Sequence, residues 1–96
     1  MMVLITYDVN TISETGQKRL RKVAKVCQDY GQRVQNSVFE CRLTESQYVR
    51  LKNKMGNIIN HECDSIRFYL LGNNWNHRIE HIGKQDLINL DGELII

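Results

Sequence analysis

The sequence lacks any apolar stretch long enough to cross a membrane or to form the core of a signal peptide. Its first apolar run, Val3 to Ile5, is followed at once by Thr6 and Asp8, whereas a membrane-spanning helix needs about 20 apolar residues. Repeats, low-complexity tracts and linkers are also missing. The 96 residues are enough for one compact domain and too few for two. We therefore expect one small domain without a membrane partner.

The sequence also lacks a cysteine framework. Its three cysteines, Cys27, Cys41 and Cys63, cannot all pair within the chain, and none has the spacing of a C-x-x-C motif. No motif places a histidine to activate a thiol. His77 and His81 have no third zinc ligand nearby in a stretch typical of turn and strand. These absences argue against a disulfide scaffold and a zinc site, and they favour a reducing, cytoplasmic setting.

Motifs for reading individual bases are missing as well. There is no helix-turn-helix, no zinc-finger spacing and no aromatic sheet signature of the common RNA-binding modules. Any contacts to nucleic acid are therefore expected to be mainly to the backbone. Trp75 either stacks on a base or partner or folds over the edge of the sheet, and the sequence assigns it no role.

Apolar periodicity predicts alternating strands and helices. Ser13 is a candidate N-cap, Gly31 a helix stop, and Thr44 with Gln47 forms a capping box. In chain order, we expect a strand at Met2 to Val9, a helix from Ser13 to Tyr30, an extended stretch from Arg33 to Leu43 kinked near Asn36, a helix from Thr44 to about Ile59, a strand from Asp64 to Leu71 and a last strand from Arg78 to Ile82.

This order predicts an α+β fold, the ferredoxin-like βαββαβ sandwich, with an additional C-terminal strand. Residues 1–84 would form the domain, and residues 85–96 an acidic and apolar C-terminal tail. The helices would cover one face of the sheet. The open face, which carries either the side of Leu4, Thr6 and Asp8 or its opposite, would be buried against a second copy. We therefore expect a symmetric homodimer.

Asp8 is the candidate catalytic residue and metal ligand. It ends the first strand directly before a polar loop, and a carboxylate there can bind a hard cation such as magnesium. One carboxylate is few for a nuclease, but a dimer would bring two Asp8 side chains to one Mg2+. Such a thin ligand set predicts slow or conditional catalysis. The alternative is an aspartate that only caps the following turn.

The cations gather in one part of the chain. The net charge is only +2, yet all 13 Lys and Arg residues lie within residues 1–84. Five of them fall between Thr15 and Gln28, where no acidic residue occurs: Lys18, Arg19, Arg21, Lys22 and Lys25. Such a face repels itself unless it has an anionic partner, which predicts nucleic-acid binding. Ordinary solvated helix faces are the alternative. Further cations could extend this basic face into a track for phosphates: Arg33, Arg42, Arg50, Lys52 and Lys54.

Three segments carry a resemblance to a known family. Leu4 to Val9, Tyr30 to Cys41 and Asp64 to Gly72 resemble the CRISPR-associated protein two family, and Arg33 to Glu40 is the most specific part. The resemblance spans nearly the whole chain. The segment Arg78 to Gly83 is similar to the type I-C subgroup of that family.

The resemblance implies a ferredoxin-like homodimer that takes part in CRISPR spacer acquisition with the integrase Cas-one. It also implies metal-dependent nuclease activity on RNA or DNA, with Asp8 as the metal ligand. In the family the last strand commonly crosses to the partner's sheet, and the C-terminal segment either contacts the integrase or packs on its own dimer. Matching the motif residue by residue adds further candidates around the site: Tyr7, Arg19, Arg21, Arg33, Ser37 and Phe39.

Two functions stay open at this point. In the first, the dimer is a magnesium-dependent endonuclease that hydrolyses phosphodiester bonds of double-stranded DNA or single-stranded RNA at paired Asp8 residues. In the second, it is a non-catalytic DNA-binding scaffold of the integrase complex, and Asp8 is dispensable. A toxin-like ribonuclease ranks last, because the segment Arg33 to Glu40 argues against it.

Overall fold

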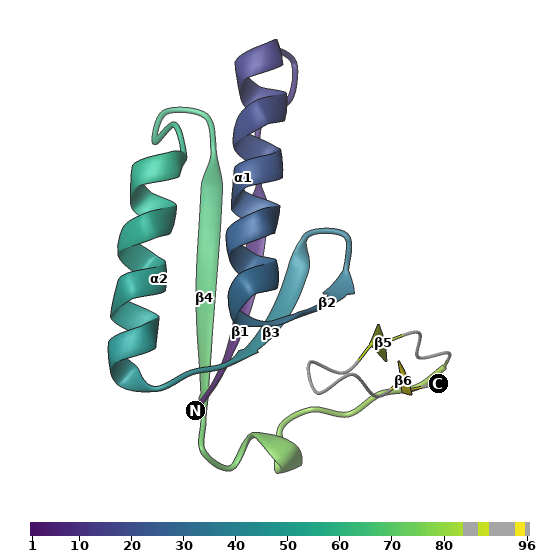
Figure 1. Cartoon of the computed structure of the whole chain (residues 1–96). Helices are drawn as coiled ribbons and strands as arrows, with labels where there is room; N and C mark the ends of the chain where they lie inside the picture. Colours follow the sequence, from purple (N-terminus) through teal and green to yellow (C-terminus); the bar gives the residue numbers. More distant parts are fainter. Residues whose placement is uncertain (84–86, 89–93, 96) are drawn as a thin grey trace.

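The computed structural model describes residues 1–83, 87–88 and 94–95 and confirms the predicted ferredoxin-like βαββαβ order. The strands β2, β3, β1 and β4 lie in that order in one antiparallel sheet, and both helices cover the same face of it (Figure 1). The elements are β1 (Met2–Asp8), α1 (Glu14–Tyr30), β2 (Gln32–Gln35), β3 (Val38–Arg42), α2 (Glu45–Ile58) and β4 (Ser65–Gly72).

The helices begin and end at residues whose local chemistry favours those positions. The Ser13 hydroxyl accepts the Gly16 N–H at 3.1 Å, and Thr44 and Gln47 make the predicted reciprocal capping box. Gly31 ends α1 by donating its N–H to the Cys27 carbonyl at 2.8 Å. A side chain at Gly31 would collide with Cys41 of β3, so the glycine also permits close packing there.

The kink predicted near Asn36 is a full reversal of the chain. Asn36 and Ser37 form a two-residue turn, so β2 and β3 are the two arms of a hairpin. The Ser37 carbonyl accepts the Tyr7 N–H at 3.1 Å, which ties the turn to β1. Short polar residues tolerate such turns well, so one alternating stretch can supply two strands.

The core lies between the sheet and the helices. Val3, Ile5 and Tyr7 of β1 face inward, and the other core residues include Val23, Cys27, Phe39, Leu51 and Met55. The alternating residues Leu4, Thr6 and Asp8 therefore lie on the opposite, open face, and Asp8 is exposed. This arrangement decides which side of β1 the helices leave uncovered.

The predicted last strand at Arg78 to Ile82 is wrong. Gly72 adopts a φ of 75°, a short 3-10 helix η1 (Trp75–His77) follows, and Ile82 is 99% exposed. A short segment after a turn can form a strand only where a sheet edge accepts it. Within the described residues, Arg78 to Ile82 pairs with no edge.

The additional C-terminal strands lie later in the chain. Strands β5 (Leu87–Ile88) and β6 (Leu94–Ile95) pair antiparallel with each other and do not extend the four-stranded sheet. The predicted boundary between residues 84 and 85, and tail residues 89–93 and 96, lie outside the described residues.

Candidate catalytic carboxylate and basic surface

Asp8 ends β1 on the open face of the sheet. It lies opposite Ser65 of β4 in the strand register, and its side chain makes no hydrogen bond or ion pair with another described residue. Other residues cap the segment that follows Asp8. The Asn10 side chain accepts the Ile12 N–H at 3.0 Å, and Ser13 caps α1. In this part of the chain, Asp8 is therefore not used as a turn cap and its carboxylate is free for a ligand.

A shallow depression surrounds this carboxylate. Its residues come from the ends of two neighbouring strands: Thr6, Tyr7 and Asp8 of β1, and Ser65, Arg67 and Tyr69 of β4. Arg67 lies opposite Thr6 and donates from Nη1 to the Tyr69 hydroxyl at 3.4 Å. The depression thus combines a free carboxylate with an exposed guanidinium, which is a suitable pair for a metal ion and a phosphate.

Arg67 and Tyr69 are site residues that were not predicted from the sequence. Their alternation with the half-buried Ile66 and Phe68 was visible in the sequence and placed them on the open face. What it did not provide was the register between β4 and β1, which places Arg67 opposite Thr6 and in the same depression as Asp8. Register between distant strands depends on the whole sheet, so alternation alone could not supply it.

The donor set around Asp8 is small. No group of three or more His, Cys, Asp or Glu residues is placed to hold a metal anywhere in the described part of the chain. Mg2+ commonly keeps several waters and takes only one or two carboxylates, with substrate phosphates completing its shell. Asp8 therefore fits a largely water-coordinated Mg2+ and does not form a complete cage within one chain.

The predicted supporting residues do come together, but behind the sheet. Tyr7 and Phe39 are buried, with their ring centroids 6.1 Å apart, and the Arg33 guanidinium lies 5.1 Å above the Phe39 ring. Burial raises the pKa of the Tyr7 phenol, whose hydroxyl donates to the Asn36 carbonyl at 3.3 Å. These side chains support β1 from the helix side, while the Ser37 carbonyl extends the pairing of β1 with β3 through the Tyr7 N–H.

Of the five predicted cations on α1, four form an exposed stripe on the outer side of the helix: Lys18, Arg21, Lys22 and Lys25. We call these four residues the α1 stripe. Lys18 lies 4.0 Å from Glu14 and Lys25 lies 2.8 Å from Asp29, each four residues away. These exposed pairs offset part of the repulsion and leave Arg21 and Lys22 without an ion pair in the described residues.

The α1 stripe and Asp8 lie on opposite sides of the sheet, because the helices cover the face that Asp8 points away from. The predicted track is thus not one continuous surface leading to Asp8 within a single chain. Arg42 of that track lies over the half-buried Trp75 ring at 4.9 Å, so Trp75 is stacked under a side chain of its own chain. Lys52 and Lys54 lie over Tyr48 and Tyr30.

The fifth cation, Arg19, has a different role. Its Nε donates to Asp64 Oδ2 at 2.8 Å and its Nη2 to Asp64 Oδ1 at 3.4 Å, and the Asp64 side chain has no exposed surface. Asp64 also accepts the backbone N–H of Asn10 and of Asn60. The Arg19 guanidinium and these amides hold the pKa of the Asp64 carboxyl well below its usual range.

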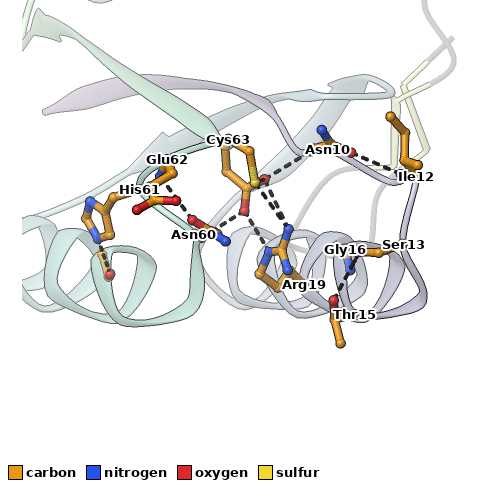
Figure 2. A network of polar contacts seen from close by, with 12 residues as sticks. Asn10, Ile12, Ser13, Thr15, Gly16, Arg19, Asn60, His61, Glu62 and Cys63 are labelled. Carbon is orange, nitrogen blue, oxygen red and sulfur yellow. Dashed lines mark hydrogen bonds and ion pairs between the residues drawn. The ribbon is translucent and has the colours of Figure 1, made fainter.

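Figure 2 shows Arg19, Asn10, Asn60 and Cys63 gathered in one polar network. Arg19 is therefore engaged by its own chain and is not a free cation for phosphate. The sequence analysis also missed Asp64 as a partner. Positions 19 and 64 are far apart in the sequence, and the only available signal was an aspartate directly before a strand that pairs with β1.

Comparisons with known proteins place these features in context. The family model described as CRISPR associated protein Cas2 matches residues 1–79. A Chlorobaculum tepidum protein named CRISPR-associated endoribonuclease Cas2 is 52% identical over 96 residues, which is all of both chains. A Halalkalibacterium halodurans protein named CRISPR-associated endonuclease Cas2 is 57% identical over 95 residues, with 99% of each chain covered.

Solved structures agree with the fold. The crystal structure of Streptococcus pyogenes Cas2 at pH 6.5 matches with a TM-score of 0.75 and 61% identity, covering 86% of this chain and all of that one. A second crystal structure, titled cas2, matches with a TM-score of 0.68 and 30% identity, covering 100% and 98%. Among the described residues, no helix has the length and apolar character needed to span a membrane.

Proposed function

The chain belongs to the CRISPR associated protein Cas2 family, and on that premise we propose that it is a metal-dependent endonuclease of CRISPR spacer acquisition with Asp8 as its catalytic carboxylate. The observation that carries this proposal is the free, exposed Asp8 side chain beside Arg67 in the depression on the open face. The two relatives named above as endoribonuclease and endonuclease support a nuclease role in CRISPR.

A second copy of the chain would complete the site. The open face carries the half-buried Leu4 and the 43% exposed Tyr69, and it is not covered by either helix. An uncovered sheet face with apolar residues favours burial against a symmetric partner. The resulting homodimer would bring two Asp8 carboxylates toward one site, which doubles the donor set of a single chain.

Each residue of the site has a defined task in this proposal. The Asp8 carboxylates would hold Mg2+, which when bound would supply Lewis-acid activation of water and offset charge on the phosphate. Arg67 would contact the phosphate group from the same depression. The exposed cations, namely the α1 stripe and Arg33, would bind the sugar-phosphate backbone of the nucleic acid. Arg19 is left out of this surface because its Nε and Nη2 bind Asp64 and its side chain is only 18% exposed.

The proposed partners follow from the family and the charge. They are double-stranded DNA, single-stranded RNA as a second substrate class, and the integrase Cas-one. We place the function in the cytoplasm, in keeping with three free cysteines, of which Cys27 and Cys41 are buried. Burial raises the pKa of both of these thiols to about 12, so they are core residues and not nucleophiles.

A second candidate function is supported by two observations. One chain offers a single carboxylate at the depression, and the α1 stripe lies on the far side of the sheet from it. Both fit a dimer that holds DNA by its backbone and bridges integrase units without cutting. In this scaffold, Asp8 would be dispensable and the α1 stripe would be essential.

The deciding experiment compares wild type with Asp8→Asn, matched for folding and dimer content, on labelled duplex DNA and single-stranded RNA with magnesium or EDTA. The endonuclease proposal expects cleavage that requires both Mg2+ and Asp8, and the substrate that is cut identifies the preference. No cleavage by wild type, with equal salt-sensitive DNA binding by both proteins, would overturn it in favour of the scaffold.

A further inference from the structure

We propose that Arg19 and Asp64 are positioning residues for Asp8, an inference that rests on the proposed endonuclease function. The two residues form a buried ion pair at the end of the sheet where Asp8 lies. The Asp64 side chain has no exposed surface, and that of Arg19 is 18% exposed. Such a pair lies outside the depression, so its influence on the reaction has to pass through the backbone.

The hydrogen bonds of Asp64 reach both chain segments that frame Asp8. Its Oδ1 accepts the N–H of Asn10, two residues after Asp8, at 3.0 Å. Its Oδ2 accepts the N–H of Asn60, in the loop between α2 and β4, at 2.9 Å. Asp64 also directly precedes Ser65, the residue paired with Asp8 across the strands. One carboxylate thus fixes the segments on both sides of the candidate metal ligand.

Asp64 has no capacity left for a ligand of its own. Each carboxylate oxygen accepts one backbone N–H and one guanidinium N–H, and Oδ1 also lies 3.6 Å from the Cys63 thiol. A carboxylate so fully occupied does not bind metal or phosphate while the fold is intact. Asp64 is therefore a positioning residue and not a second catalytic carboxylate.

The energetics of the pair also favour a role in geometry. A buried ion pair contributes little net stability compared with apolar residues of the same size, but it disfavours every arrangement in which its charges are unpaired. Here the favoured arrangement joins α1, the loop after β1 and the loop before β4. Since a shift of about 1 Å in a catalytic group can cost about 100-fold in rate, fixing these segments matters for Asp8.

The symmetry of the contacts makes Asp64→Asn an informative substitution. Whichever oxygen becomes the NH2 group, it meets one backbone N–H and one guanidinium N–H, so donors face donors. The asparagine must release the Asn10 side or the Asn60 side of the network. Arg19→Lys is the milder companion variant, because it keeps the charge but loses the two-pronged contact.

The experiment measures kcat and KM of Mg2+-dependent cleavage for wild type, Asp64→Asn and Arg19→Lys. The matched control is Asp29→Asn, which removes the partner of the exposed Lys25 pair on the same helix. We expect kcat to fall about 10- to 100-fold in Asp64→Asn and less in Arg19→Lys, with KM within about twofold of wild type. Asp29→Asn should leave kcat unchanged, because Asp29 lies far in the sequence from Asp64 and its side chain pairs only with Lys25 among the described residues.

A second readout does not depend on activity. The 13C signal of the Asp8 carboxyl and its backbone amide signal should shift in Asp64→Asn and Arg19→Lys but not in Asp29→Asn. A folded Asp64→Asn protein with wild-type kcat and unshifted Asp8 signals would overturn the positioning role. If wild type itself shows no Asp8-dependent cleavage, the proposed function fails, and the Asp8 signals alone then decide the positioning role by the same criterion.

Discussion

Two aspartates at the same end of the sheet have opposite environments. Asp8 ends β1, is exposed and has no polar side-chain partner among the described residues, whereas Asp64 directly precedes β4 and is buried with all its acceptor sites used. The residue type is the same, so the difference lies in what surrounds each carboxylate. A free carboxylate is available for a metal ion, while a satisfied one holds the fold in place.

The largest expected effect separates activity from stability at Asp8. Asp8→Asn removes a charge without removing a contact, so cleavage should fall by about 100-fold or more while the free energy of unfolding changes by no more than about 0.5 kcal/mol. Cleavage assays and urea unfolding of the same preparations test this. A large loss of stability would show that Asp8 is engaged in the fold.

Asp64→Asn should differ from Asp8→Asn by a clear loss of stability. Breaking the buried pair leaves the Arg19 charge and one backbone N–H poorly satisfied, so we expect the free energy of unfolding to fall by about 2–4 kcal/mol. The control is Asp29→Asn, whose exposed pair with Lys25 should contribute no more than about 0.5 kcal/mol. Equal losses for the two variants would contradict the comparison.

The pH dependence of the free energy of unfolding should reflect the lowered pKa of the Asp64 carboxyl. Its pKa in the folded protein is below the ordinary value of 3.8, so its contribution is fully present above about pH 4 and is lost as the pH falls toward the folded-state pKa. Urea unfolding between pH 2 and pH 6 should therefore show a weaker acid-side decline in Asp64→Asn than in wild type. Parallel curves for the two proteins would contradict the assigned cause.

The α1 stripe should affect binding more weakly than Asp8 affects cleavage. Reversing the charges of Arg21 and Lys22, which have no ion pair among the described residues, should lower duplex DNA affinity about tenfold and reduce the salt slope of binding by about 1 to 2. Reversing one charge at Arg50 on α2 serves as a comparison, with a smaller effect expected. An unchanged salt slope would remove the α1 stripe from the nucleic-acid surface.

The local parts of the fold could be predicted from the sequence because their signals are local. The caps at Ser13 and Thr44 lie three residues from the groups they bind, and the alternation in β1 identifies two faces directly. The strand predicted at Arg78 to Ile82 failed for the opposite reason. The segment was placed as a strand by its position after the turn region, but a strand also needs a neighbouring edge, and the residues of a segment do not report one.

In the candidate site, too, local features could be predicted from the sequence and long-range contacts could not. Asp8 could be singled out because it ends a strand before a polar loop, which is a property of a few adjacent residues. The contact of Arg19 with Asp64 joins positions 45 residues apart and depends on how α1 packs against the end of the sheet. The sequence analysis therefore grouped Arg19 with its charged neighbours, although burial gives it a different partner and a different role.

Whether Asp8 binds the metal is tested most directly by titrating the protein with Mn2+, a paramagnetic substitute for Mg2+, and measuring the free ion by electron paramagnetic resonance. We expect wild type and Asp29→Asn to bind Mn2+ equally, added Mg2+ to displace it, and Asp8→Asn to abolish the binding. Undiminished Mn2+ binding by a folded Asp8→Asn protein would contradict the assignment of Asp8 as the metal ligand.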